Sequence, residues 1–325
     1  MPEGTEDKLA QCFRTLDEAI ATVAQEEFES LRRGHRSAYV TTQVARALGE
    51  LKRLRQPRGA PPSYDDPWVV LCYVLWYQPA QTFLALKCLE RLARLRSHER
   101  LHIVDFGCGA LATEMAVDIA LATGYLDSSA REPSDVMVDS LDSSATMIRF
   151  GEAISRELLN SISWPGDESD IWSERNLVDA SDWNFTEVGD FVDTWLMGLH
   201  AVYDQSIDSA QSQVAAIDEL VGADCILLTT HSLKASLLRR VLPKDESSRI
   251  IRLSAAKIER ESLPSMDRIK EMRMEIRRFA VGSKLPDSHS DDIALVRSYM
   301  GGVPDLFQSI DRVSCRLHAR EEDQG

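Results

Sequence analysis

The sequence lacks an apolar run of the roughly 18 residues that a membrane-spanning helix needs. The first residues, Met1–Gln11, are polar and acidic, so they do not resemble a secretory signal. Internal repeats and low-complexity tracts are also absent. We therefore expect a cytoplasmic protein without a membrane partner, and 325 residues are enough for one large or two modest domains with a real core.

Paired cysteine motifs are missing as well. The six cysteines are scattered and form no C-x-x-C pair, which argues against a zinc site and against a disulfide framework, so we expect no metal. Most of them lie in apolar runs and are expected to pack as small core residues. They are Cys12, Cys72, Cys88, Cys108, Cys225 and Cys315.

Positive charge is scarce in the second part of the chain. Residues 1–100 hold 15 Lys and Arg against 13 Asp and Glu, and residues 101–325 hold 22 against 39, which gives net charges of +2 and −17. An acidic domain repels phosphate backbones, which disfavours nucleic acid as a partner. The basic runs at 32–36 and 52–58 indicate solvated helix faces or, as the alternative, a phosphate-binding patch.

The most informative segment is Leu101–Ala116, LHIVDFGCGALATEMA. An apolar strand runs into Asp105, a Gly107-x-Gly109 turn follows, and a helical pattern begins after it. Glycines let a backbone approach a ligand closely, and the N–H groups at a helix N-terminus point toward it. This arrangement predicts a nucleotide-binding turn, in which Cys108 is a small filler or, alternatively, a reactive thiol.

A second strand-like segment, Val136–Met147, supports this prediction. It ends in Asp142 within a D-x-S-x-x-M pattern, and an acid at the end of a second strand can accept both hydroxyls of a ribose. The distance from Gly109 to Asp142 exceeds the roughly 20 residues that are usual for a dinucleotide site, so the first crossover carries an insertion.

Taken in order, these segments resemble the class I S-adenosylmethionine (SAM)-dependent methyltransferases. Asp105–Gly109 is similar to the first motif of that family, and Asp142–Met147 to the second. Leu177–Ala180 is similar to the third motif, whose acid contacts the adenine amino group. Phe191–Tyr203 is similar to the fourth strand with the helix after it, and Ala223–Thr230 to the fifth strand. The resemblance implies SAM as cofactor. It also implies an α/β fold with a seven-stranded, mostly parallel Rossmann-like sheet and helices on both faces.

One position departs from the family pattern. Many members carry a third glycine where this chain has Leu111. A branched side chain at this turn should hinder a diphosphate more than the slim amino-acid arm of SAM. We therefore expect no binding of NAD or FAD.

The hydrophobic pattern predicts helices before the sheet. Lys8–Arg32 and Ala45–Leu54 have apolar residues at helical spacing, and Gln56–Pro62 is a candidate linker. An aromatic helix follows over Trp68–Leu95, with a kink or break at Gln78-Pro79. We expect a helical N-terminal region over residues 1–100, which is either a lid or a permanently packed cap, and a SAM-binding domain over residues 101–325.

The last part of the chain gives a weaker pattern. Ile250–Leu253 and Arg312–His318 are candidates for the sixth and seventh strands. Between them, only a helix over Met266–Arg278 and a polar loop over Lys284–Asp292 can be assigned.

The candidate site residues follow from these motifs. His200 and Tyr203 come after the fourth strand and His231 after the fifth, where each is a catalytic base, a polar anchor or a structural residue. Tyr73 and Tyr77 share a helix face and either pack in the core or reach the cofactor. The remaining cofactor candidates are Asp105, Gly107, Cys108, Gly109, Asp142, Ser143, Met147, Asp179, Ala180 and Leu199.

Two functions remain open. The first is a SAM-dependent methyltransferase acting on an unidentified acceptor, for which a small molecule is favoured. The alternative is a methyltransferase-like protein that binds ribosomal RNA or a protein partner, because Tyr73–Leu92 faintly resembles a family associated with the small ribosomal subunit.

Overall fold

The computed structural model describes most of the helices and strands of the chain. The described residues are 4–54, 61–93, 100–125, 136–162, 176–178, 193–199, 207–231, 235–242, 249–253, 265–281, 290–301 and 313–319.

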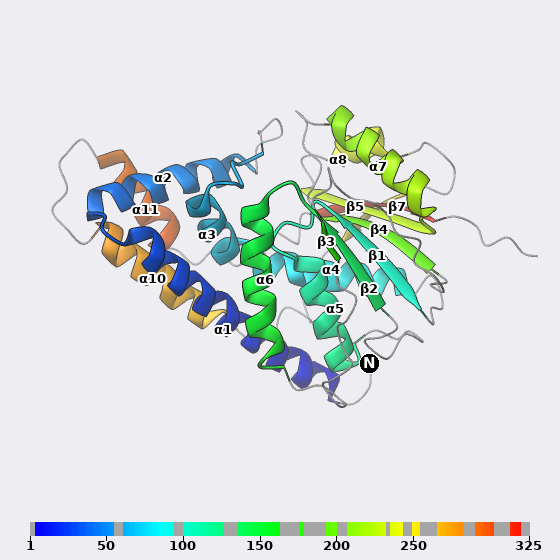
Figure 1. Ribbon diagram of the computed structural model, residues 1–325, viewed down its shortest axis with the longest axis horizontal. Helices are drawn as coiled ribbons and strands as arrows, with labels where there is room; N and C mark the ends of the chain where they lie inside the picture. The colour runs from blue at the N-terminus through cyan, green and yellow to red at the C-terminus, as the bar shows by residue number, and fades with distance from the viewer. Residues whose placement is uncertain are drawn as a thin grey trace, which may run out of the picture.

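A mixed β-sheet forms one end of the molecule (Figure 1). Its strand order is β3-β2-β1-β4-β5-β7-β6. All neighbours from β3 to β5 are parallel, whereas β7 is antiparallel to both β5 and β6. The strands are β1 (Leu101–Phe106), β2 (Val136–Leu141), β3 (Asn176–Val178), β4 (Asp193–Leu199), β5 (Cys225–His231), β6 (Arg249–Leu253) and β7 (Val313–Ala319). The predicted α/β architecture with a mostly parallel sheet is confirmed.

Helices cover both faces of this sheet. Alternate residues of β1 enter two different cores: Ile103 packs with the helices on one face, and Val104 with those on the other. The first face carries α4 (Gln78–Ala93), α5 (Ala112–Thr123) and α6 (Ala145–Leu159). The second carries α7 (Ile207–Val221) and α8 (Ala235–Val241).

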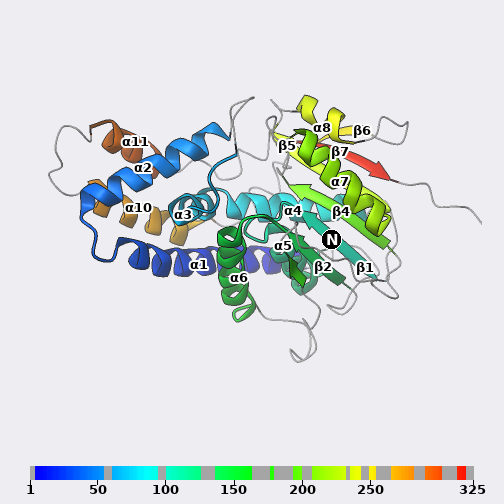
Figure 2. The ribbon, with the colours of Figure 1, turned by 45° about the horizontal axis from the view of Figure 1, so that its top comes forward.

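The remaining helices form a layer beside the sheet that extends to the opposite end of the molecule, and α1 runs from that end to beneath α6 and α5 (Figures 1 and 2). Two of them come from the second part of the chain, and α10 packs on α1 while α11 packs on α2. The layer consists of α1 (Thr5–Arg32), α2 (Ser37–Arg53), α3 (Pro67–Trp76), α10 (Asp267–Val281) and α11 (Ser290–Gly301). The sequence did not predict α11, whose first turn falls inside the segment Lys284–Asp292 that was expected to be a loop.

The aromatic segment, predicted as a helix with a kink or break at Gln78-Pro79, is two helices. Asp66 caps the start of α3 by accepting a hydrogen bond from the Trp68 N–H at 2.9 Å, and Pro67 occupies the first turn. The helix ends at Trp76, and α4 begins at Gln78 with a bend of 59° between the two axes. Pro79 has no N–H for a continuous helix, which explains the break that the sequence indicated.

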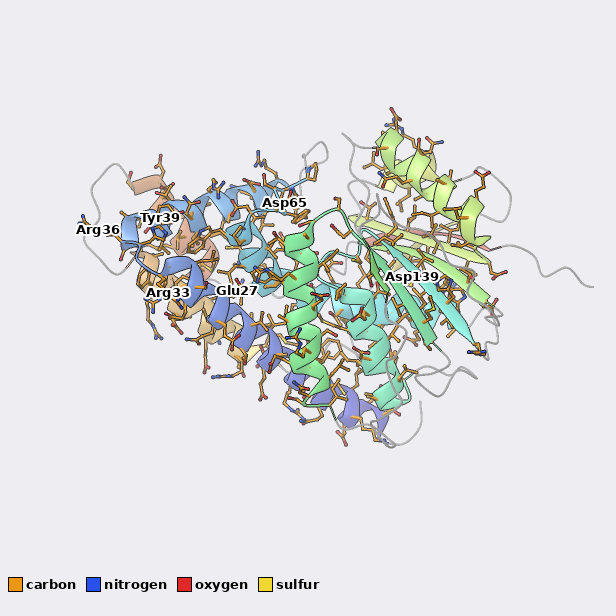
Figure 3. All side chains as sticks on the ribbon, viewed as in Figure 1. Glu27, Arg33, Arg36, Tyr39, Asp65 and Asp139 are labelled. Carbon is orange, nitrogen blue, oxygen red and sulfur yellow. The ribbon has the colours of Figure 1, made fainter. Side chains whose placement is uncertain are left out.

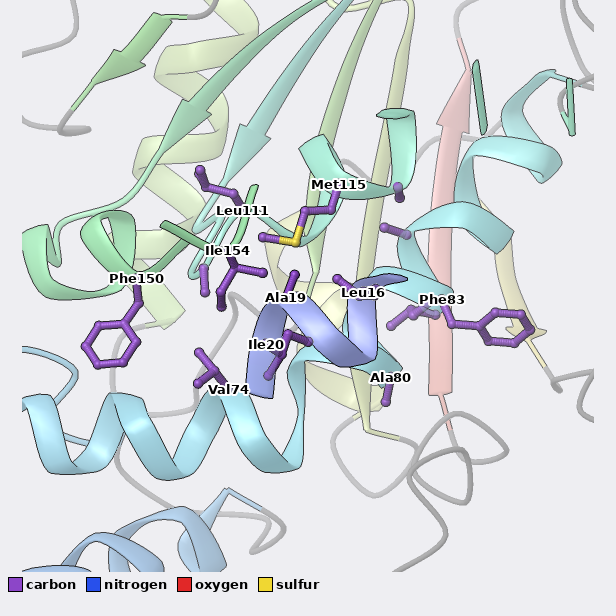
Figure 4. Packing of buried hydrophobic residues seen from close by; sticks show 14 of the residues in the cluster. Leu16, Ala19, Ile20, Val74, Ala80, Phe83, Leu111, Met115, Phe150 and Ile154 are labelled. Atoms are coloured by element: carbon purple, nitrogen blue, oxygen red, sulfur yellow. The ribbon is translucent and has the colours of Figure 1, made fainter. Parts of the chain in front are cut away.

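The N-terminal helices share one continuous core with the helices on the sheet. In Figure 4, Leu16 and Ile20 of α1 lie beside Met115 of α5 and Ile154 of α6, and all four side chains are fully buried. A lid that opens as a body would expose this surface to water. The shared core therefore favours the packed cap over the lid.

This packing predicts that the helical layer and the sheet unfold together. Ile20→Val removes one buried methylene and should lower the free energy of unfolding by about 1 kcal/mol. Denaturant unfolding should still show a single transition, shifted to lower midpoint. Leu220→Val is the control, because Leu220 is 55 % exposed and its change should leave the midpoint in place. A separate early transition, sensitive only to Ile20→Val, would support the lid instead.

The basic run at 32–36 lies far from the sheet. Arg33 and Arg36 are exposed at the junction of α1 and α2, at the outer end of the helical layer (Figure 3). Their exposure is compatible with both the solvated face and the phosphate-binding patch.

Within the described residues, no single helix is long and apolar enough to cross a membrane. The bent pair of α3 and α4 meets the length and composition criteria only when the two helices are counted together.

Candidate functional site

The glycine loop, defined here as Gly107–Leu111, joins β1 to α5 at the carboxyl edge of the sheet. The N–H groups of Gly107 and Cys108 both donate to the Leu141 carbonyl, at 2.7 and 3.1 Å, so the loop is fixed to the end of β2. Gly107 and Gly109 have φ angles of 68° and 59°, which favour glycine. The order of the sheet reverses between β1 and β4, and ligands of open α/β sheets bind at such a point.

Asp142 holds the glycine loop and the start of α6 together. Its Oδ2 accepts a hydrogen bond from the Gly109 N–H at 2.9 Å, and its Oδ1 accepts one from the Ser144 N–H at 2.8 Å. Ser144 in turn caps α6 through its hydroxyl, which accepts from the Met147 N–H. The structure thus brings Asp142 to the loop as the sequence predicted, and it leaves Ser143 exposed beside it.

Aromatic side chains approach the other side of the loop. Tyr73 stacks on Tyr77 with ring centroids 5.5 Å apart and meets the edge of Tyr64 at 5.6 Å. A Cβ atom on Gly109 would lie 3.1 Å from Cε of Met147 and 3.9 Å from the Tyr73 hydroxyl oxygen. Tyr73 and Met147 therefore converge on Gly109, and both stand among the predicted cofactor residues.

Three carboxyl groups gather at the loop. Asp105, the fifth residue of β1, is 1 % exposed, and Asp142 and Glu114 lie near it. Burial raises the pKa of the Asp105 carboxyl from 3.8 to about 7; Asp142 and Glu114 add to this rise, and the Thr113 hydroxyl opposes it. Among the described residues, Oδ1 of Asp105 has no hydrogen-bond partner.

Cys108 is not a reactive thiol in this environment. It is buried, and burial together with the charges of Asp105, Asp142 and Glu114 raises its pKa well above 9.0. A protonated thiol is a poor nucleophile, so the small-filler interpretation is the one that fits.

Leu111 does not act as the sequence suggested. Its side chain is fully buried between α5 and α6 near Phe150 and Ile154, as Figure 4 shows, rather than facing a ligand. The steric argument against a diphosphate was therefore wrong in its mechanism. The backbone of Leu111 is nevertheless left-handed, with φ 59° and ψ 41°, the only such residue other than glycine in the described part of the chain.

Two residues near the site were missed by sequence reasoning. Gln78 is fully buried, and its Nε2 donates to the Ala110 carbonyl at 2.7 Å. Arg273 of α10 is 2 % exposed and lies over the Trp76 ring, 3.2 Å from its centroid, and burial lowers its pKa to about 9. The available signal for Gln78 was a polar residue directly after the apolar and aromatic run Trp68–Tyr77. Arg273 lies on a helix whose packing partners the sequence did not reveal.

The other candidates are only partly placed. Leu199 ends β4 and is half-buried, and His231 ends β5 opposite Val313 of β7. Asp179, Ala180, His200 and Tyr203 lie outside the described residues. In the part of the chain that the structure describes, no three His, Cys, Asp or Glu side chains are arranged to hold a metal.

Comparison with known proteins gives solved structures but no sequence match. No protein-family model and no curated protein sequence matches the chain. A SAM-dependent methyltransferase from Geobacter sulfurreducens, with S-adenosylhomocysteine (SAH) bound, is similar over 73 % of this chain and 91 % of its own, at 11 % identity and a TM-score of 0.37.

Two further structures are similar at the same level. A geranyl diphosphate C-methyltransferase from Streptomyces coelicolor matches over 86 % of this chain and 96 % of its own, at 14 % identity and a TM-score of 0.31. The small RNA methyltransferase HEN1 matches over 74 % of this chain but 25 % of its own, at 15 % identity and a TM-score of 0.31. Similarity at this level does not establish a function, which has to be inferred from the chain's own residues.

Proposed function

We propose that the chain is a SAM-dependent methyltransferase whose cofactor binds across the glycine loop. The observation that carries this proposal is the buried acidic group at the loop, Asp105 with Glu114 and Asp142 near it. Nearby positive charge strengthens the binding of a pyrophosphate at a helix N-terminus, and nearby carboxylates weaken it. The same carboxylates strengthen the binding of a ligand that carries a cationic ammonium and a sulfonium.

The described residues fit such a ligand. Oδ1 of Asp105 has no partner among the described residues, and a buried acceptor of this kind is expected to meet a donor when the site is filled. Asp142 is assigned to the ribose hydroxyls, and Tyr73 or Tyr77 to the methionine carboxylate. Asp179 is assigned to the adenine amino group by its motif alone.

The chemistry asked of the protein is mainly positioning. SAM supplies an already activated methyl group when bound, so the residues around it have to hold the acceptor in line and exclude water. A base is needed only for a hydroxyl or a protonated amine. The proposed base or polar anchors are His231, the last residue of β5, and His200 and Tyr203, which come after β4 in the sequence.

A small molecule is the proposed acceptor. The net charge of −17 over residues 101–325 opposes the approach of a phosphate backbone. The basic residues Arg33 and Arg36 lie at the far end of the helical layer from the glycine loop (Figure 3). Lys52 and Arg53 of the second basic run are exposed at the end of α2, and residues 55–58 of that run lie outside the described residues. The RNA-binding alternative has no comparable support from the site.

The ribose assignment predicts that Asp142→Ala weakens SAH binding at least about tenfold, because a charge-assisted contact contributes roughly 1.5–3 kcal/mol. Calorimetry with SAH and with its 2′-deoxy analogue tests it. The wild-type protein should discriminate between the two ligands, and the variant should not. Glu152→Ala, which removes an exposed carboxylate from α6, is the control and should bind both ligands like the wild type. Equal discrimination in a folded Asp142→Ala variant would exclude the ribose contact.

A further inference from the structure

The left-handed backbone at Leu111 needs an explanation. A residue with a Cβ pays roughly 1–2 kcal/mol for this conformation, which glycine adopts without penalty. Leu111 is the N-cap residue of α5, and its N–H donates to the Cys108 carbonyl at 3.1 Å. This bond holds the N–H side of the peptide that joins Ala110 to Leu111, and the carbonyl side of the same peptide is held from outside the loop.

Gln78 makes the contact that can do so. Its Nε2 donates to the Ala110 carbonyl at 2.7 Å and lies 3.6 Å from Sδ of Met115. The side chain is fully buried, and within the described residues its Oε1 has no hydrogen-bond partner. A buried amide that leaves one of its own atoms unsatisfied is costly, which implies that the bond to Ala110 has a role.

We propose that Gln78 is a positioning residue that fixes the Ala110–Leu111 peptide in the orientation the glycine loop needs to bind SAM. Rotation of this peptide plane would turn the Ala110 carbonyl away and let Leu111 return to a negative φ. The hydrogen bond from Gln78 opposes that rotation. The chain thus replaces the conformational freedom of a third glycine with a buried amide supplied by α4, one residue after Tyr77. The part of this proposal that concerns ligand affinity rests on the proposed function.

The first test compares Gln78→Met with Gln81→Met. Methionine nearly preserves the volume but cannot donate to Ala110, and Gln81 lies one turn further along the same helix with no hydrogen bond to the loop among the described residues. Hydrogen exchange of a peptide covering residues 107–115 should become at least about tenfold faster in Gln78→Met and stay unchanged in Gln81→Met. Unchanged exchange in both variants would overturn the proposal, whether or not the protein binds SAH.

A second variant, Gln78→Glu, gives a pH signature that a merely structural role would not give. A protonated carboxyl can donate to the Ala110 carbonyl, whereas an ionised one can only repel it. The ratio of the variant's SAH dissociation constant to that of the wild type should therefore rise with pH. The same ratio for Gln78→Met should stay constant, because the titration of Asp105 contributes equally to both proteins. A flat ratio for Gln78→Glu would count against the hydrogen bond.

The sharpest test combines Gln78→Met with Leu111→Gly. In the wild-type background, Gln78→Met should raise the SAH dissociation constant about tenfold, which is about 1.4 kcal/mol. In the Leu111→Gly background the same change should raise the SAH dissociation constant less than about threefold, because glycine adopts the left-handed conformation without the strain that the Gln78 bond offsets. Equal losses in both backgrounds would overturn the link between Gln78 and Leu111. If the wild-type protein binds no SAH, the proposed function fails. The link between Gln78 and Leu111 is then tested by comparing the hydrogen-exchange rates of residues 107–115 in the same four proteins.

Discussion

At about pH 8 the Asp105→Asn variant should unfold at a higher temperature than the wild-type protein and yet bind SAM up to about a hundredfold more weakly. Few substitutions of a buried charged residue stabilise a fold. The expectation follows from the position of Asp105, which is 1 % exposed and lies near Glu114 and Asp142. We infer that a carboxylate which lowers stability in the ligand-free protein has a role in ligand binding.

The stability of the folded wild-type protein should fall as the pH rises toward 7. The pKa of Asp105 is raised from 3.8 to about 7 in the folded protein, so the folded state holds more protons than the unfolded state between these values. The stability that protonated Asp105 contributes to the fold is fully present below pH 3.8 and is lost as the pH rises through about 7. This rise in the pKa of Asp105 means that folding disfavours the ionised carboxyl by about 4 kcal/mol relative to the protonated one. An asparagine carries no charge and avoids this loss.

Binding should depend on pH in the opposite sense. A cationic ligand favours ionised Asp105, so SAM affinity should increase from about pH 6 to pH 8 in the wild type and stay flat in Asp105→Asn. Asp139→Asn is the matched control, because Asp139 is equally buried but pairs with Nε2 of His102 at 2.9 Å. That change should lower stability and leave SAM affinity unaltered. A destabilised Asp105→Asn variant with normal affinity would contradict this account of the site.

A single methyl group on Gly151 should disrupt both the fold and the site. A Cβ atom at this position of α6 would lie 2.7 Å from the Ala110 carbonyl carbon and 2.7 Å from Cγ of Leu111. Backbone atoms cannot yield as a flexible side chain does, so α6 must move away from the glycine loop. Gly151→Ala should lower the free energy of unfolding by about 3 kcal/mol despite the better helix propensity of alanine. The moved loop should also bind SAH at least about tenfold more weakly.

Gly49→Ala is the control for this prediction. Gly49 also lies inside a helix, α2, but a Cβ atom there would meet only Cδ2 of Leu295 at 4.0 Å. The same substitution should therefore raise the free energy of unfolding by about 0.5–1 kcal/mol and leave SAH affinity unchanged. Chemical denaturation of both variants measures the difference. Similar stabilities for the two alanine variants would show that α6 does not press on the loop.

Sequence reasoning located the glycine loop because the signals there are local. The strand before Asp105, the two glycines after it and the serine cap after Asp142 all act within a few residues. The break at Gln78-Pro79 was visible for the same reason. The predicted bounds of the first helix and of the sixth and seventh strands agree with the structure within a few residues, whereas the second helix begins at Ser37, eight residues before the predicted Ala45.

The contacts between distant segments could not be predicted. The bond from Gln78 to Ala110 joins residues 32 positions apart, and that between Arg268 and Asp17 spans 251. Periodicity identifies a buried face but not its partner, so the packing of α10 against α1 was not visible. The error at Leu111 has the same origin, because only the packing of α6 reveals that its side chain points into the core.

Calorimetric titration of the full chain with SAH tests the central claim most directly, with NAD as the comparison ligand. The acidic loop predicts one SAH site per chain with a dissociation constant in the micromolar range, near −8 kcal/mol, and no heat of binding with NAD. A folded protein that binds NAD at micromolar concentration and does not bind SAH would contradict the assignment of the glycine loop.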